Sequence, residues 1–495
     1  MTVSYLIFCL MLIPFFIWYQ SLDSRAHLFI SVTAVYLILS VATQNGLMLN
    51  LRDPFCLFLL WAVLSNSWST CAKQSWVDTL FWISAFTVYE CGRLTAVEEV
   101  FRMIALTVIP ILIVVAVQVT KMRKGYLATG QRPGGVFGNN VHLGAYLTVC
   151  LFCGLWLTAN ASIWYLLIVF PTGAMIGLTR SKGALLASVV CLPIAAGMMS
   201  PMTASSLAAA GISAAVLIAA GYYARLYPSS LVERIVFYVL ACETISRRPL
   251  HGWGLRTFRR EQFFAYERIR TKYPGLYKRL LQPKTHRVHN DYLEIAHETG
   301  LVGLGLFAWT LFNIDLPGDM LQALPLIAVL IMSLMFFPLR EPHIAIPFWA
   351  IAGSIQGPGE APPLSGLLSL LILLALSIVT YQYGVKKLLA LYWWYRIPKT
   401  ADPEKRQQAI FKAHLLDPFN NRYLMYLYKA SVRRNPQFAM ECAGRIFEHF
   451  DGAITARSVS EIKPQFIAKS APVKPPASGS RTQGRTSKKK KRKKP

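Results

Sequence analysis

The sequence has few charged residues, and it lacks the motifs of nucleotide-dependent and metal-dependent enzymes. Charged residues make up 15% of the 495 positions, whereas soluble domains usually carry about a quarter. There is no phosphate-binding P-loop, no G-x-S-x-G motif, no D-x-D pair and no His, Asp or Glu group at metal-ligand spacing. These absences exclude P-loop NTPases, hydrolases with that nucleophile motif and metal-dependent transferases that use nucleotide sugars. We therefore expect no metal and no cofactor.

Long apolar blocks take the place of the missing charge. Hydrophobic residues make up 54% of the chain and gather in blocks of 15 to 22, long enough for a helix to cross a hydrocarbon core of roughly 30 Å. In lipid every backbone N–H and C=O needs a partner within its own segment, so these blocks should be helices. We predict an all-α integral membrane protein with twelve or thirteen transmembrane helices. The expected spans are 1–20, 27–43, 54–69, 76–93, 101–120, 141–158, 162–179, 183–200, 203–223, 296–314, 320–338, 343–356 and 364–385.

One long cationic segment interrupts this membrane pattern. It runs from about 223 to 295, inside a membrane body predicted to cover 1–385. If the first helix starts in the cytoplasm, the segment is a large external loop, against the positive-inside tendency. Its cations then either bind an anionic lipid phosphate or attach the loop to lipid headgroups.

The C-terminal part is predicted to be soluble and helical. Aromatic residues at 392–395 resemble an interfacial belt, and 386–455 looks like a helical-repeat segment with one tetratricopeptide-like unit at 409–430. The tail 456–495 should be disordered, because its last 25 residues hold ten Lys or Arg and no acid. We expect the tail to contact membrane lipids and expect no nucleic acid partner. Thirteen spans would place this part on the outer side of the membrane, and twelve would place it on the cytoplasmic side.

Five motif-like stretches follow one another along the predicted membrane body. They are LSNSWSTCAKQSW at 64–76, RPGGVFGNNVHLGAYL at 132–147, LTRSKGALLAS at 178–188, ERIVFYVLACETISRRPLHGWGLRTF at 233–258 and HNDYLEIAHETGLVGLGLF at 289–307. Together, over roughly 50–355, they resemble the O-antigen ligase and polymerase superfamily. His289 with Gly300 and Gly303 matches the His-x10-Gly-x-x-Gly spacing of the ligases, whereas Lys182 stands where the family usually has Arg. The resemblance implies a metal-independent membrane glycosyltransferase with a lipid-linked donor.

The same stretches supply cations that suit such a donor. A glycan linked to polyprenyl diphosphate is anionic at its phosphates, and the planar fork of Arg binds phosphate oxygens in pairs. Cations would also stabilise the charge that grows on the departing diphosphate. Contact with lipid headgroups is the alternative role for each of them. The candidate diphosphate-binding residues are Arg132, Arg287, Arg256, Arg180 and Lys182.

The acceptor hydroxyl needs a base, and one histidine is favoured for that role. An imidazole with an ordinary pKa of about 6.5 suits proton transfer near neutral pH. We assign the catalytic role to His289 because of the motif spacing, with His286 and His297 as alternatives.

Neighbouring residues should support this histidine. Asn290 either orients His289 or caps the following helix. Glu298, four positions after Glu294, either accepts a proton or pairs with loop arginines, and pairing is favoured. Gly300, Gly303 and Gly305 should permit tight helix packing.

These patterns predict transfer of a glycan from polyprenyl diphosphate to a hydroxyl acceptor. The reaction would take place on the outer face of the bacterial cytoplasmic (inner) membrane, towards the periplasm or the cell exterior. The ligase spacing favours lipid A core as the acceptor, and the alternatives are a growing polysaccharide or a protein hydroxyl. A transporter of the same lipid-linked glycan is the alternative from a different class. It would not need His289, and the repeated halves typical of transporters are not evident in the sequence.

Overall fold

A computed structural model shows a helical protein, and no strand occurs in the part of the chain that it describes. Within the described residues the apolar blocks form helices, as predicted, because backbone groups in such segments are satisfied within the helix itself. The described residues are 28–34, 53–121, 132–198, 211, 229–272, 287–315, 318–358, 374–396, 403–418, 421–431, 435 and 437–442. The predicted span 1–20, His286 and the tail 456–495 lie outside these residues.

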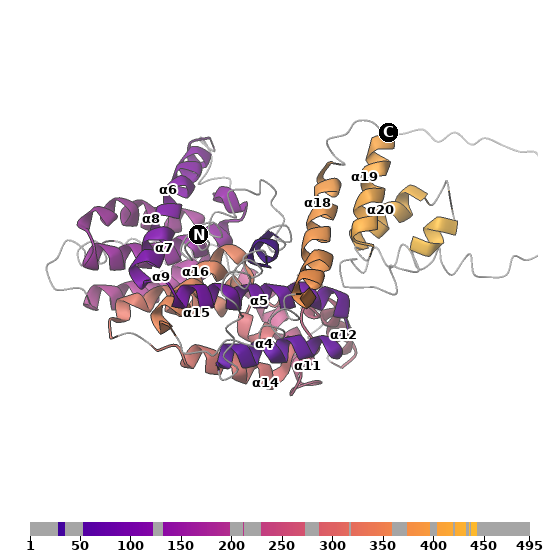
Figure 1. Ribbon diagram of the computed structural model, residues 1–495, viewed down its shortest axis with the longest axis horizontal. Coiled ribbons are helices and arrows are strands. Elements are labelled where there is room, and N and C mark those ends of the chain that lie inside the picture. Colours follow the sequence, from indigo (N-terminus) through magenta and orange to yellow (C-terminus); the bar gives the residue numbers. More distant parts are fainter. Residues whose placement is uncertain are drawn as a thin grey trace, which may run out of the picture. The chain divides into compact units, whose positions relative to one another are not determined.

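In the described part of the predicted membrane body, nine helices surround one large apolar core (Figure 1). α16 packs on α5, α7 on α6 and α8, α15 on α9 and α7, and α14 on α4. Stacked rings mark the centre of the core: the Phe55 and Trp349 ring centroids lie 4.3 Å apart, and Trp82 is fully buried beside both. The helices are α4 (Pro54–Leu64), α5 (Ala72–Arg93), α6 (Val97–Lys121), α7 (Asn140–Asn160), α8 (Leu166–Thr179), α9 (Lys182–Met198), α14 (Asp291–Phe312), α15 (Leu324–Ser333) and α16 (Pro342–Gln356).

Three of the described helices are long and apolar enough to cross a membrane. They run over Val97–Thr120, Asn140–Asn160 and Asp291–Phe312, which overlap the predicted spans 101–120, 141–158 and 296–314. Four shorter apolar segments coincide with other predicted spans, at Pro54–Ser67, Ile163–Thr179, Lys182–Met198 and Leu324–Ser333.

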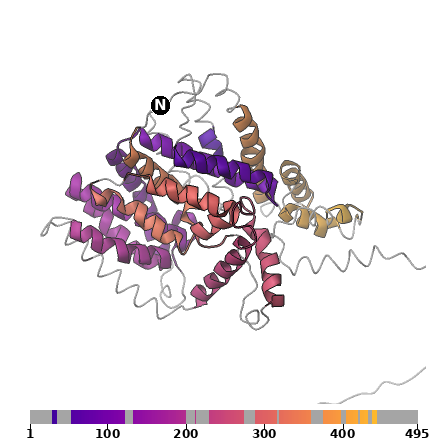
Figure 2. The same cartoon turned by 90° about the horizontal axis from the view of Figure 1, so that it is seen from below.

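The segment predicted as a large loop contains two helices, α11 (Ser229–Ile245) and α12 (Phe258–Lys272). Both helices contact each other and the start of α14 (Figure 2). They share a small apolar core of their own, in which Leu240, Phe258 and Val288 are almost fully buried. The charged residues of α11 and α12 therefore lie on a folded scaffold.

The described C-terminal residues are also helical. A π-helical turn at Tyr381–Val385 leads into α18 (Lys386–Arg396), which α19 (Pro403–Leu416) and α20 (Asn421–Ser431) follow. The Trp394 ring packs on Tyr423 with 4.9 Å between centroids, so part of the aromatic stretch predicted as an interfacial belt packs against a neighbouring helix instead of standing alone.

Candidate functional site

Two of the motif stretches bind each other through their backbones. The Trp253 and Gly254 N–H groups donate to the carbonyls of His297 and Glu298, at 3.0 and 2.8 Å. In the other direction, the Leu301 N–H donates to the Pro249 carbonyl at 2.7 Å. The loop 249–254 therefore lies along an opened turn of α14 at 297–302. This pairing places the two motifs side by side.

Glycines make the close contact between these motifs possible. Gly300 interrupts α14 with φ 72° and ψ −176°, a region that is essentially restricted to glycine. A Cβ on Gly300 would lie 2.1 Å from the Leu250 carbonyl oxygen, and one on Gly303 would lie 2.1 Å from Thr299 Oγ1. The predicted packing role is confirmed at both positions. At Gly305 it is wrong, because a Cβ there would meet no atom within 4 Å.

A buried ion-pair cluster occupies the space beside this junction. Arg287, just before α14, lies 2.9 Å from the Asp78 carboxylate of α5 and 2.7 Å from that of Glu294. Arg340, between α15 and α16, lies 3.2 Å from Asp78 and 2.5 Å from Glu298. Glu294 therefore pairs with a loop arginine, Arg287, as predicted, whereas the closest partner of Glu298 is Arg340, which lies outside the loop. Charges this deeply buried are tolerated only when they are paired in this way.

Arg256 extends the cluster towards the surface. Its backbone N–H donates to Glu298 Oε1 at 2.6 Å, and its guanidinium lies 3.5 Å from Asp78. The Arg256 side chain is 28% exposed, that of Arg287 is 19% exposed, and that of Arg340 is 1% exposed. Two of the predicted diphosphate-binding residues thus combine fixed carboxylate partners with partial access, whereas Arg340 is sealed inside.

The carboxylates keep these guanidinium groups charged. Burial alone lowers the pKa of Arg287, but Asp78, Glu294 and Glu298 more than offset this and raise it well above its usual range. The pKa of Arg340 is raised in the same way. Both side chains therefore remain permanent cations.

His289 follows Arg287 by two positions, and its ring packs against two aromatic rings. Its ring stacks on Phe237 with 5.6 Å between centroids and lies 5.1 Å from the ring of Phe337. Burial, together with the positive charge of Arg234, lowers the pKa of His289 to about 4. The Tyr238 hydroxyl donates to the His289 carbonyl at 3.1 Å and holds the backbone in place. The imidazole is consequently neutral across the physiological range, and its pKa of about 4 makes it a weaker base than the ordinary imidazole expected from the sequence.

A second group of cations is linked to this histidine through Arg234. Arg132 and Arg234 both act electrostatically on Lys182, and Arg234 acts on His289. Lys182 begins α9, directly after the turn in which Arg180 ends α8. The structure therefore divides the predicted site cations into two sets. Arg256 and Arg287 belong to the ion-pair cluster, whereas Arg132 and Lys182 form a set with Arg234, and Arg234 is the member that acts on His289.

Backbone strain marks three of the predicted site residues. Among the described non-glycine residues, only Arg180, Arg256 and His289 have a left-handed φ, of 51°, 61° and 62°. Such backbone costs on the order of 1–3 kcal/mol at each position and concentrates at functional sites.

The contacts of His297 make it a poorer candidate for the base than His289. Asn290 caps α14, because its Oδ1 accepts from the Leu293 N–H at 2.9 Å. Both ring nitrogens of His297 are engaged, Nδ1 with Thr244 at 2.7 Å and Nε2 with Thr257 at 3.1 Å. His297 is fully buried, so it fixes α14 to the motif loop.

Sequence reasoning missed Asp78, Arg340 and Arg234 as site residues. Asp78 is an acid inside a predicted span, which by itself suggests function or pairing. Arg340 lies between two predicted spans, and Arg234 was only one cation among many in the loop. Their importance depends on partners that are distant in sequence, such as Arg340 and Asp78, 262 positions apart.

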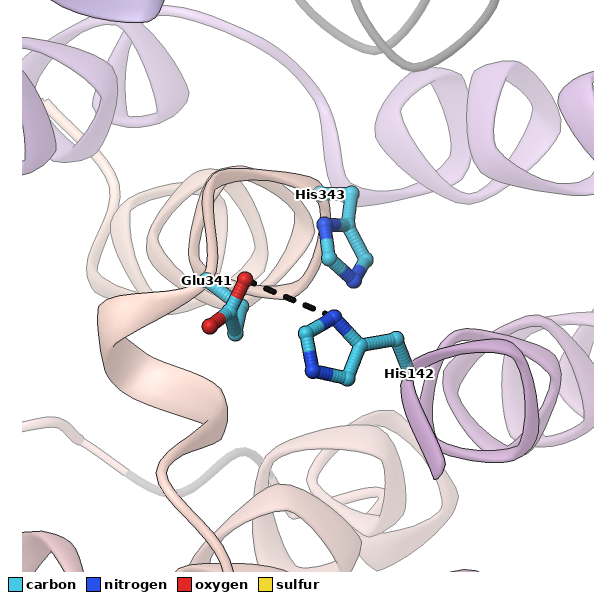
Figure 3. A group of neighbouring side chains, drawn as sticks. All are labelled: His142, Glu341 and His343. Carbon is cyan, nitrogen blue, oxygen red and sulfur yellow. Dashed lines mark ion pairs between the residues drawn. The ribbon is translucent and has the colours of Figure 1, made fainter. Parts of the chain in front are cut away.

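A separate group of possible metal ligands lies away from the ion pairs. His142, Glu341 and His343 are buried, and their ligand atoms all lie within 4.8 Å of one another (Figure 3). Residue spacing along the sequence does not reveal this group, because α7 and the start of α16 are far apart in sequence.

Comparison with known families agrees with this arrangement. Residues 144–308 match the family model for O-Antigen ligase. The resemblance to the O-antigen ligase superfamily is thereby confirmed, and the match identifies a family of glycosyltransferase-like enzymes. The comparison with curated proteins found no match.

The O-antigen ligase segment, residues 144–308, contains most of the site described above. It includes Arg180, Lys182, Arg256, Arg287 and His289. Three further site residues lie outside this segment, and the fold places them near residues within it: Arg132, Asp78 and Arg340. The predicted roles of the individual residues rest on the motif spacing and on the geometry described above, because the family match assigns no role to any single residue.

Proposed function

We propose that this chain is an integral membrane glycosyltransferase that moves a glycan from a polyprenyl diphosphate to a hydroxyl acceptor. The reaction takes place at the outer face of the bacterial cytoplasmic membrane, and lipid A core is the favoured acceptor. No metal takes part in the transfer. The family match supports the reaction class, and the strained backbone at Arg180, Arg256 and His289 is the observation that carries the site.

In the proposed reaction His289 takes the proton of the acceptor hydroxyl. The hydroxyl oxygen forms a bond to the anomeric carbon of the donor sugar, while the bond from that carbon to the phosphate oxygen breaks. The electron pair of the broken bond leaves with the polyprenyl diphosphate. Burial keeps this imidazole in the neutral form that a base requires, and the same burial lowers its pKa to about 4, which makes it a weaker base than a histidine with the ordinary value.

The cations stabilise the departing diphosphate. Arg287 is held by Asp78 and Glu294 on one side and is still 19% exposed, so its fork is fixed before the donor arrives. A fixed cation stabilises the growing charge without reorganising during the reaction. Arg256 adds a second partly exposed guanidinium beside it. Arg132 and Lys182 add positive charge beside Arg234, which acts on His289, and Arg180 lies two residues before Lys182.

The position of these residues fits a reaction at the membrane surface. Arg287 and His289 both lie just before Asp291–Phe312, a helix long and apolar enough to cross a membrane. A lipid-linked donor would present its diphosphate at that depth, with the polyprenyl chain in the bilayer. We infer that α11 and α12, which pack on the start of α14, form the external wall of the site.

Two other acceptors and one other function class remain as alternatives. The helices α18, α19 and α20 favour a protein acceptor if they dock one, and a growing glycan would make the enzyme a polymerase. A transporter of the same lipid would use the cations without the histidine.

The decisive experiment measures transfer in proteoliposomes that contain a polyprenyl-diphosphate glycan and one acceptor at a time. His289→Ala should lower the transfer rate by at least about 100-fold, as loss of a general base does. His286→Ala, which removes the rival three positions earlier, should leave the rate near that of the unmodified enzyme. Unchanged transfer by His289→Ala would exclude the catalytic role, and donor translocation without any transfer would indicate the transporter.

A second pair of variants tests the donor site. Arg287→Lys keeps the charge but removes the planar fork, so we expect a higher KM for the donor. Arg102→Lys is the matched control, because Arg102 forms an exposed ion pair with Glu98 on α6. Equal donor KM values for the two variants would show that Arg287 serves only the ion-pair cluster.

A further inference from the structure

We propose that His142, Glu341 and His343 form a buried site for a divalent transition metal ion, with zinc as the occupant. This site is separate from the proposed transfer chemistry, and it acts on the structure of the protein. The three residues come from two helices, because His142 lies in the first turn of α7 and the other two lie at the start of α16.

The geometry of the three side chains suits a metal ion. Their ligand atoms lie within 4.8 Å of one another, and His142 Nδ1 is 3.5 Å from Glu341 Oε2. Around a tetrahedral zinc ion with bonds of about 2.1 Å, two ligand atoms stand roughly 3.4 Å apart. One edge of the group therefore already has the required length, and the His343 ring needs only a small shift. Figure 3 shows both imidazoles and the carboxylate turned towards a common point.

The surroundings hold the ligands in place. The side chains of His142, Glu341 and His343 are only 2%, 3% and 1% exposed. The His343 ring stacks on Phe137 with 4.5 Å between centroids, and the His142 ring lies 5.1 Å from that of Phe336. Burying the negative charge of a carboxylate is costly, and a divalent cation held by the carboxylate and the two imidazoles would balance that charge.

The ligand types select the metal. Two imidazoles and one carboxylate are a set that zinc accepts in proteins, whereas Mg²⁺ and Ca²⁺ favour oxygen ligands. A metal there would join the start of α7 to the start of α16. Glu341 directly follows Arg340, so the ion would also fix the turn that carries Arg340 into the ion-pair cluster.

The test is the metal content of the full-length protein, purified in detergent with an affinity tag that contains no histidine. We expect about one zinc ion per chain by mass spectrometry. After removal by a chelator, Co²⁺ should rebind and give the visible absorption bands of a site with nitrogen and oxygen ligands. Zinc should also raise the temperature of thermal unfolding.

Three variants locate the ion. His142→Asn, Glu341→Gln and His343→Asn should each weaken metal binding by at least about 10-fold, since even outer-shell changes have effects of this size. Glu90→Gln is the matched control, because Glu90 is a partly buried carboxylate of α5 that pairs with Arg93. It should keep the wild-type metal content.

Two outcomes would overturn the proposal. The first is a wild-type protein that neither contains zinc nor shows a cobalt spectrum when cobalt is supplied in excess. The second is equal metal binding by the wild type and Glu341→Gln. The wild-type measurements do not depend on how the variants fold. None of these readouts involves glycan transfer, so failure here leaves the proposed enzyme activity untouched, and the reverse also holds.

Discussion

Replacing Arg340 with Met should destabilise the protein strongly, although Arg340 cannot reach a substrate. Its side chain is 1% exposed, it contacts Glu298 and Asp78 at 2.5 and 3.2 Å, and its guanidinium lies 4.9 Å from the centre of the Trp82 ring. Met preserves much of the volume but leaves Glu298 buried without its closest cation. Removing one partner from a buried ion pair costs about 3–5 kcal/mol.

The matched control is Arg102→Met. Arg102 pairs with Glu98 on α6, with 54% and 46% of the two side chains exposed. Solvent screens such a pair, so its loss should cost only about 0–1 kcal/mol. The assay is thermal unfolding in detergent, followed by tryptophan fluorescence, with both variants prepared in parallel.

A third variant separates lost charge from lost packing. Adding Glu298→Gln to Arg340→Met removes the stranded charge, while the Gln carbonyl can still accept from the Arg256 N–H. We expect the double variant to recover part of the lost stability. Our reasoning would be refuted if Arg340→Met unfolds at the same temperature as Arg102→Met. It would also fail if the double variant is no more stable than the single one, because packing would then explain the loss.

Three further predictions follow from the residues around the histidine and the helix break. Because the folded-state pKa of His289 is about 4, the transfer rate should fall only as the pH drops through about 4. Phe237→Ala should move the pH of that fall upward, towards the ordinary histidine value of about 6.5. A fall near pH 6.5 in the unmodified enzyme would contradict this. Gly300→Ala should lower the free energy of unfolding by at least about 3 kcal/mol, through backbone strain and a clash with the Leu250 carbonyl oxygen. Gly305→Ala should be tolerated. Equal unfolding temperatures of the two variants would disprove the difference. Asn290→Ala should lower the free energy of unfolding by about 1 kcal/mol, because the cap of α14 is lost. Asn290→Asp should retain most of the stability that the cap provides. Denaturant unfolding of the two variants measures this difference.

Hydropathy predicted the helices well where the physics is local. The segments at 101–120 and 141–158 were expected as helices, because an apolar block must satisfy its own backbone in lipid, and α6 and α7 occupy them. The cap at Asn290 follows from the same kind of local chemistry. The cationic stretch 223–295 was predicted as a large loop from its charge, and the motif resemblance covered 233–258, so α12 was not anticipated.

Much of the site could not be predicted from sequence, because its contacts join distant segments. The spacing of His289, Gly300 and Gly303 indicated one motif, but no pattern related Asp78 to Arg287 or Arg340. The ion-pair cluster depends on how α5, α14 and the turn before α16 pack. His142 and Glu341 meet for the same reason. Such encounters are properties of the fold, and a single sequence does not display them.

The backbone pairing of 249–254 with 297–302 has a consequence for how this protein can be altered. Each strip of chain supplies both the hydrogen bonds and the glycine clearances that the other requires. Transplanting either strip alone from a distant homologue would mismatch the register, even if every charged side chain were retained. Chimeric enzymes should therefore work only when both strips are exchanged as one cassette, and natural variation at the two strips should be inherited jointly.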